Sequence, residues 1–346
     1  MTANQVTPPQ FAGRIIEKYL SSQSTAFVIY GNTKDIYPVQ DGRYVPLVDF
    51  LIEYLIKPFK PSAPKIVIIY DPAEGITFHN PLDRDDIASR IGEERLAKIL
   101  AASRTDIVTA LDTMRRLVKL DDDAITAKNI SKPFAVIIKH AETVAPSQQY
   151  ASMADSERLK IITLENWLSE DRFVISNNIV FLISETLGEV NGRVVELPYV
   201  SAINIERPSG VERRSFLSKL AKTESAINQD DMDQLTFSSA GLSLLSIRQI
   251  VNQASYRGIK VNPAHIFEKA REIIEKELEG HVSFLTLDYG FEKVLGSKLL
   301  INRLNELKTF LNGSDPELMP VGILVPGANG VGKTFIFKAF AKECGW

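Results

Sequence analysis

A segment near the end of the sequence has the residue types and the spacing of a phosphate-binding loop. Residues 327–334 are Gly-Ala-Asn-Gly-Val-Gly-Lys-Thr, which matches the pattern GxxxxGK followed by Ser or Thr. Glycines let the backbone turn tightly, so that its N–H groups and the positive end of a following helix can hold the β-phosphate of a nucleotide. The spacing therefore predicts an ATP-binding loop made of Gly327, Ala328, Asn329, Gly330, Val331, Gly332, Lys333 and Thr334.

The last two residues of this loop have distinct expected roles. Lys333 would reach the β- and γ-phosphates, and Thr334 would offer its hydroxyl to a Mg²⁺ ion that bridges two phosphates. Thr334 is therefore the predicted metal-binding residue, with ATP and Mg²⁺ as the cofactors. The alternative is a glycine-rich turn that binds no ligand. The flanking sequence favours the phosphate loop, because residues 321–325 predict a buried strand and residues 335–342 predict a helix.

A phosphate-binding loop cannot hydrolyse ATP by itself. A second strand must present an acidic residue to Mg²⁺, and a further group must position the attacking water. Only 12 residues follow Thr334, which is enough for one helix. We therefore expect the chain to stop inside the domain that contains the loop. No catalytic residue is assigned, and the chain alone is expected to be inactive as an ATP hydrolase.

Upstream of the loop, apolar and amphipathic segments alternate. Short, nearly uninterrupted apolar runs are typical of strands covered on both faces, and they occupy residues 26–30, 66–70, 134–138 and 179–183. Longer segments with a helical spacing of apolar residues lie between them, at residues 47–56, 87–100 and 107–117. This βαβ order predicts an α/β fold with a P-loop NTPase-like parallel sheet.

Changes in this pattern divide the chain into four expected parts. Residues 1–24 form a polar leader and a first helix, and residues 25–207 form the α/β domain. Residues 208–280 lack convincing strands and have apolar positions three and four apart, so we expect a small helical subdomain. Residues 281–346 begin a second α/β domain, with a helix at 298–311 followed by the phosphate-binding loop.

Composition argues against several classes of function. The formal net charge of −3 and the isoelectric point near 5.9 give no electrostatic reason to bind nucleic acid. The single cysteine, Cys344, cannot form an internal disulfide, and the four histidines are too scattered for a metal-binding motif. No apolar run approaches the roughly 20 residues that span a bilayer. The N-terminus does not resemble a signal peptide, so we expect a cytoplasmic protein that is not inserted into membranes.

The phosphate-binding loop and its surroundings resemble those of AAA+ ATPases. The segment Thr-Phe-Ile-Phe-Lys-Ala-Phe-Ala-Lys-Glu-Cys-Gly at residues 334–345 is similar to the AAA+ continuation, whereas ABC transporters usually follow the loop's Gly-Lys with Ser-Thr-Leu. Residues 289–296 resemble the segment that leads into many AAA+ modules. The chain is thus identified as a member of the AAA+ type of P-loop NTPases, in which residues 284–346 would start an active second module.

The region before residue 280 resembles a first AAA+ module that has lost its nucleotide site. The turn after its opening strand, residues 31–35, lacks the glycine spacing that wraps a phosphate. Lys139 and His140 follow the strand in the Walker B place, where an active module would present Asp and Glu, and a lysine there would repel Mg²⁺. Residues 241–250 resemble the lid helix of the family. Arg248 would be its sensor 2 residue, although an exposed structural arginine is the preferred interpretation.

The resemblance implies a function that the spacing alone does not show. A degenerate first module followed by an active second one implies an oligomer, commonly a hexameric ring, that couples ATP hydrolysis to the remodelling of a protein partner. Two alternatives stay open. The chain is a non-catalytic adaptor or scaffold built on a degenerate ATPase-like domain, or it is a complete small NTPase in which carboxylates of the first module finish the site.

Overall fold

The structure is a computed structural model that describes residues 8–56, 65–124, 133–149, 152–170, 173, 177–277, 289–296, 298–311, 322–328 and 330–344. The chain forms two compact units, Met1–Ala270 and Arg271–Trp346. Each unit has a buried core of its own. Within the described ranges, the helices are too short or too polar to cross a membrane.

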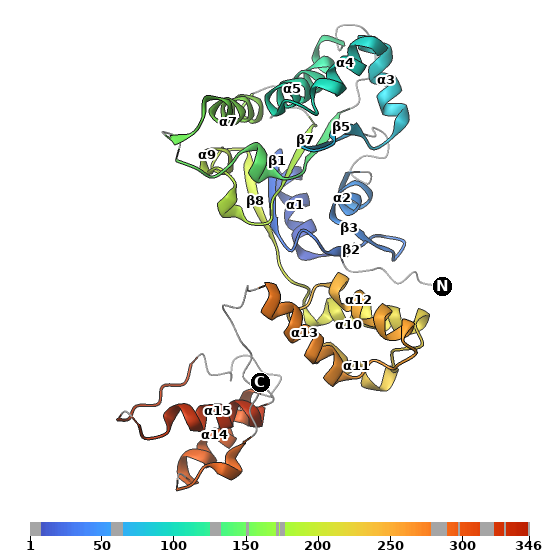
Figure 1. Ribbon diagram of the computed structural model, residues 1–346. Coiled ribbons are helices and arrows are strands. Elements are labelled where there is room, and N and C mark those ends of the chain that lie inside the picture. The colour runs from blue at the N-terminus through green and yellow to red at the C-terminus, as the bar shows by residue number, and fades with distance from the viewer. Residues whose placement is uncertain are drawn as a thin grey trace. The chain divides into compact units, whose positions relative to one another are not determined.

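A six-stranded sheet forms the centre of the first part of the first unit, up to residue 206 (Figure 1). Its order is β5-β4-β6-β7-β1-β8, and neighbouring strands are parallel except for β5, which pairs antiparallel with β4. The strands are β1 (Ala26–Gly31), β4 (Ile66–Asp71), β5 (Gly75–Phe78), β6 (Phe134–Ile138), β7 (Ile179–Ile183) and β8 (Val200–Ile205). A separate antiparallel hairpin, β2 (Ile36–Pro38) and β3 (Tyr44–Pro46), follows β1 in the chain.

Helices cover both faces of this sheet. One face packs against α3 (Pro81–Ile91), α4 (Glu93–Ala102), α5 (Ile107–Ala124), α6 (Ala141–Val144), α7 (Asp155–Leu168) and α9 (Gly192–Val195). The other face packs against α1 (Gln10–Leu20) and α2 (Leu47–Phe50), which continues as the π-helical segment η1 (Leu51–Ile56). A 3-10 turn, η4 (Leu187–Glu189), follows β7. The first unit therefore has the layered α/β fold that the sequence predicts.

The inner strands of the sheet are almost entirely apolar because alternate side chains enter opposite layers. In β1, Ala26 and Val28 lie in the core beneath α5 and α7, while Phe27 and Ile29 lie in the core beneath α1 and α2. The ring of Phe27 stacks on that of Phe181 from β7, with 5.9 Å between the centroids. Both faces are therefore buried, which is why the predicted strands contain so few polar residues.

The strands predicted at residues 26–30, 66–70, 134–138 and 179–183 are confirmed to within one residue at each end. The sequence pattern misses β8, because Ser201 and Asn204 interrupt the apolar run in this edge strand. One continuous helix at residues 87–100 is wrong. Gly92, with a φ of 91°, separates α3 from α4 at this point.

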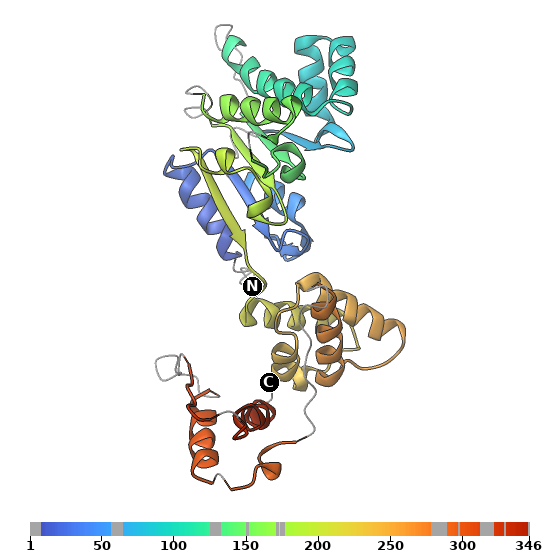
Figure 2. The ribbon, with the colours of Figure 1, turned by 60° about the vertical axis from the view of Figure 1, so that its left-hand side comes forward.

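The region after β8 is helical, as its sequence predicts. It contains α10 (Gly210–Thr223), a short turn η5 (Gln229–Asp231), α11 (Met232–Ser238), α12 (Leu244–Tyr256) and α13 (Pro263–Glu277), which lie together in Figure 2. A capping box starts α10, because Ser209 and Glu212 exchange side-chain to backbone hydrogen bonds. The apolar stripe of α12 is buried and consists of Leu244, Ile247, Ile250, Val251 and Ala254.

The described residues of the second unit include η6 (Phe291–Lys293), α14 (Lys298–Leu311) and α15 (Lys333–Cys344). Leu304 of α14 shares a small core with Ile336 and Phe340 of α15. A buried strand at residues 321–325 is wrong for the described residues 322–325, which form no strand and leave Leu324 91% exposed. A strand needs a hydrogen-bonded neighbour, and the described part of this unit contains none.

We expect Phe181→Ala to be strongly destabilising, because this ring is fully buried in the sheet. Removing a buried phenylalanine ring costs roughly 3–5 kcal/mol of unfolding free energy. The midpoint of urea denaturation, followed by far-UV circular dichroism, should fall accordingly. Leu82→Ala in α3 is the control, since that side chain is 71% exposed. A similar loss of stability in both variants would contradict the assigned core.

Candidate phosphate-binding site

Helix α15 begins inside the predicted phosphate-binding loop, at Lys333. Gly330 and Gly332 before it have φ angles of 85° and 84°, a left-handed conformation that residues with a Cβ rarely adopt. The carbonyl of Gly332 accepts a hydrogen bond from the Ile336 amide at 3.0 Å, which closes the first turn. The glycines thus let the chain turn sharply into the helix, whose first N–H groups point back toward the loop.

The Lys333 side chain folds over the loop. Its Nζ donates hydrogen bonds to the carbonyl oxygens of Gly327 at 2.5 Å and Ala328 at 2.6 Å. The first turn of α15, Lys-Thr-Phe-Ile, contains no acidic residue. A cation at a helix N-terminus is unfavourable, because the helix dipole is positive there. The two loop carbonyls that accept these hydrogen bonds provide partial negative charge next to the lysine ammonium.

The loop is open to solvent. Its exposed residues are Gly327, Ala328, Gly330, Val331, Gly332 and Thr334, while Asn329 lies outside the described residues. An ideal Cβ at Gly330 or Gly332 would meet no atom within 4 Å, so backbone conformation rather than crowding requires glycine there. The start of this 12-residue helix combines left-handed glycines, a lysine and a threonine hydroxyl. These groups fit a phosphate, and the hydroxyl fits its Mg²⁺ ion.

Aromatic packing supports the start of α15. The ring of Phe335 stacks on that of Tyr289, with centroids 4.4 Å apart, and the ring of Phe340 stacks on that of Phe291 at 6.2 Å. Near the end of the helix, Glu343 accepts a hydrogen bond from the Phe291 amide at 3.3 Å. These contacts fix α15 against the segment around η6, so the loop has a defined support.

In the first unit, the segments that follow the sheet strands carry paired charged side chains in place of a glycine-rich loop. Lys139, which follows β6, pairs with Asp71 at the end of β4, with 2.5 Å between Nζ and Oδ2. Burial by itself raises the pKa of Asp71, but the hydrogen bonds from Lys139 and the Ala73 amide outweigh burial, so the pKa lies below its usual value. Lys34, in the turn after β1, pairs with Glu185 after β7. Both lysines are thus matched by carboxylates of the same unit.

Arg248, the sensor 2 candidate from the sequence, lies in α12 and packs against another helix of the region after β8. Its guanidinium carbon lies 5.6 Å from the centroid of the Phe216 ring in α10. This contact agrees with a structural arginine.

The structure also brings together a polar group that the sequence pattern does not indicate. The carboxylate of Asp35 is buried and accepts hydrogen bonds from the amides of Leu244 and Leu245 at the start of α12. The local sequence around residues 31–35 is that of an ordinary polar turn. Burial of Asp35 depends on a contact with a segment far along the chain, so no local signal identifies it.

Comparison with known proteins places most of the chain in described domain families. Residues 3–206 match the family model of the AAA+ chaperone N-terminal Rossmann-like domain, and residues 211–279 match that of the AAA+ chaperone second helical domain. A chain in the solved structure of the E. coli MS115-1 HORMA:CdnC:Trip13 complex is 13% identical, with 75% of this chain and 77% of that chain covered and a TM-score of 0.46. That likeness is too distant to support a functional conclusion. No curated protein matches this chain at a significant level.

Lys139→Met should reduce the acid-sensitive stability that Asp71 provides, because only the Ala73 hydrogen bond then remains of the two that lower the pKa of Asp71. Because folding lowers the pKa of Asp71, its contribution is present above the ordinary value of 3.8 and is lost as the pH falls through the lower folded value. Melting temperatures of wild type and Lys139→Met should therefore differ at neutral pH and converge in acid. Lys98→Met, which breaks the exposed pair with Glu94 on α4, is the control and should change little at any pH. A pH-independent difference for Lys139→Met would contradict the assigned role of the pair.

Proposed function

The chain belongs to the AAA+ chaperone family, and from this premise we propose that its loop at residues 327–334 binds ATP together with Mg²⁺. The N-terminus of α15 supports the proposal most directly. Lys333 and the left-handed glycines meet there, and the first turn supplies no acidic side chain. A helix start of this kind attracts an anion, and a phosphate provides one.

Each loop residue has a part in the proposed site. A phosphate would replace the carbonyls of Gly327 and Ala328 as the partner of Lys333, because a charge-assisted hydrogen bond to an anion is stronger than one to a neutral carbonyl. The backbone N–H groups of the glycine-containing loop, including Asn329 and Val331, would face the phosphate oxygens. The Thr334 hydroxyl would hold Mg²⁺, which neutralises phosphate charge when it is bound.

The proposed role of the whole protein follows the family resemblance. An oligomeric, ring-forming ATPase in the cytoplasm would couple ATP hydrolysis to the remodelling of a protein partner. Residues 25–207 and 208–280 would form a supporting module, and residues 281–346 would belong to the nucleotide-binding one. The pairing of Lys139 with Asp71 favours a supporting role, since an acidic residue facing Mg²⁺ is needed for hydrolysis. A non-catalytic adaptor is the competing function, and it predicts that the loop binds no nucleotide.

Lys333→Ala should weaken ATP binding severely, because the variant loses the cation that meets the β- and γ-phosphates. One charge-assisted hydrogen bond contributes roughly 1.5–3 kcal/mol, so the affinity should fall by about 10- to 150-fold. Isothermal titration calorimetry of the full chain with ATP and Mg²⁺ measures this change. Lys338→Ala, further along α15, removes the same charge but spares the loop. Equal ATP affinity in wild type and Lys333→Ala would refute the site.

Thr334→Ala tests the metal contact separately from the phosphate contact. Wild type should bind ATP more tightly with Mg²⁺ than with EDTA, and this advantage should shrink by about tenfold when the hydroxyl is lost. Thr334→Ser keeps the hydroxyl and should behave like wild type. If the Mg²⁺ dependence of Thr334→Ala equals that of wild type, Thr334 is not the metal-binding residue.

A further inference from the structure

The loop after β1 lies where ligands usually bind in an open parallel sheet. After β1, the next strand of this sheet along the chain is β4, which lies on the β7 side of β1. After β7, the chain continues to β8, which lies on the opposite side of β1. The carboxyl ends of β1 and β7 therefore mark the point at which the strand order reverses, and ligands bind in the crevice at such points. Residues 31–35 and Glu185 occupy this place in the first unit.

The first three backbone N–H groups of this loop already have partners within the chain. The amide of Gly31 donates to the carbonyl of Glu185 at 2.9 Å, and the amide of Asn32 donates to that of Ile205 at 2.9 Å. The amide of Thr33 donates to the Gly31 carbonyl at 2.7 Å. A Cβ at Gly31 would lie 2.5 Å from the Ile205 oxygen, so the two backbones are in close contact. These amides are therefore not directed at a bound phosphate.

The loop ends in a buried carboxylate that reaches the helical region. The Asp35 residue is 3% exposed and accepts hydrogen bonds from the Leu244 amide at 3.0 Å and the Leu245 amide at 2.7 Å. It also accepts from the Ile36 amide at 2.8 Å and from the Asn32 side chain at 2.8 Å. These partners are N–H donors, which suits an ionised carboxylate because it can only accept. Asp35 is thus an anion at the N-terminus of α12.

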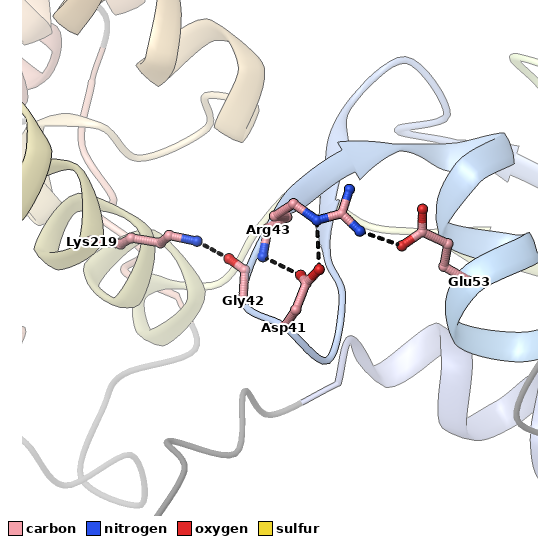
Figure 3. Close-up of polar contacts among 5 residues, drawn as sticks. All are labelled: Asp41, Gly42, Arg43, Glu53 and Lys219. Carbon is pink, nitrogen blue, oxygen red and sulfur yellow. Dashed lines mark hydrogen bonds and ion pairs between the residues drawn. The ribbon is translucent and has the colours of Figure 1, made fainter.

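The hairpin that follows Asp35 makes a second contact with the helical region. Lys219 of α10 donates a hydrogen bond to the carbonyl of Gly42 at the hairpin tip (Figure 3). Its Nζ also lies 5.2 Å from the centroid of the Tyr44 ring, which meets the Phe216 ring edge-on at 4.6 Å. The hairpin strand β2 contacts α12 as well. Residues 31–46 therefore join the sheet domain to both α10 and α12.

The tip of the hairpin is held in shape by its own ion pairs. Arg43 pairs with Asp41 at 2.5 Å and with Glu53 of η1 at 2.8 Å, and Figure 3 shows its guanidinium between the two carboxylates. The Arg43 amide also donates to Asp41 at 2.8 Å. This network anchors the tip to the sheet domain and leaves the Gly42 carbonyl to meet Lys219.

We propose that Asp35 is a built-in anion that fixes the helical region onto the sheet domain, and that it makes this arrangement in the first module independent of nucleotide. Helix N-termini bind phosphates in other proteins, but the start of α12 already meets the carboxylate of Asp35. A phosphate placed there would lie beside a buried like charge, which is unfavourable. The proposal concerns the first unit and does not rest on ATP binding by the second.

Hydrogen–deuterium exchange of the full chain tests this proposal. In Asp35→Asn the charge and one acceptor oxygen are lost, so exchange of the Leu244 and Leu245 amides should accelerate by at least about tenfold. Asp41→Asn is the matched control, because Asp41 lies at the same hairpin but holds Arg43 rather than α12. Unchanged exchange at the start of α12 in Asp35→Asn would overturn the proposal.

Two further measurements keep the test decisive if Asp35→Asn does not fold. Lys219→Ala removes the contact at the hairpin tip and should accelerate amide exchange at residues 42–44. Unchanged exchange at these residues would count against the hairpin as a connection between the sheet and α10. Wild type with ATP and Mg²⁺ should show no added protection at residues 31–35 or 244–245. Protection by ATP that is confined to residues 330–334 supports both the proposed ATP site and the proposed role of Asp35. Protection of residues 31–35 by ATP overturns the proposed role of Asp35.

Discussion

The positive N-terminus of a helix is stabilised by negative charge or by hydrogen-bond acceptors, and two helices of this chain differ in this respect. The first turns of α12 and α15 contain no acidic residue. For α12 the anion is the side chain of Asp35, which is distant in sequence. At the start of α15 the loop carbonyls of Gly327 and Ala328 accept hydrogen bonds from the Lys333 side chain and not from the N–H groups of the helix. The partner of α12 is part of the chain itself, whereas under the proposed function a phosphate of ATP would be the partner of α15.

Asp35 can act in this way only because the sheet holds the strand before it. β1 pairs with β7 on one side and β8 on the other, so the position of its carboxyl end is fixed from both sides. Close contact between the backbones at Gly31 and Ile205, and the hydrogen bond from the Asn32 amide to the Ile205 carbonyl, then fix the start of the following turn against β8. The apolar layers on both faces of the sheet thus determine where a single polar side chain meets the helical region.

The sequence predicts features that depend on local spacing and misses those that depend on distant partners. The runs in β1, β4, β6 and β7 are identifiable because burial on both faces excludes polar residues. β8 lacks such a run, and its place beside β1 comes from pairing across the sheet. The loop at residues 327–334 is a local motif, so its glycines and Lys333 are found by spacing alone. Asp35 is not, because its partners Leu244 and Leu245 lie 209 and 210 residues away.

Under the proposed function the first unit binds no nucleotide, and its charged groups have partners within the same unit. Where a nucleotide-binding loop would rely on a ligand to order its charged groups, Lys139 is held by Asp71 and Lys34 by Glu185. Asp35 adds the anion for α12. Since these partners belong to the chain itself, the proposed role of Asp35 implies that the order of the first unit does not change with ATP concentration. Under the proposed function, the first unit would then act as a constant platform, and only the helix that starts at Lys333 would respond to nucleotide.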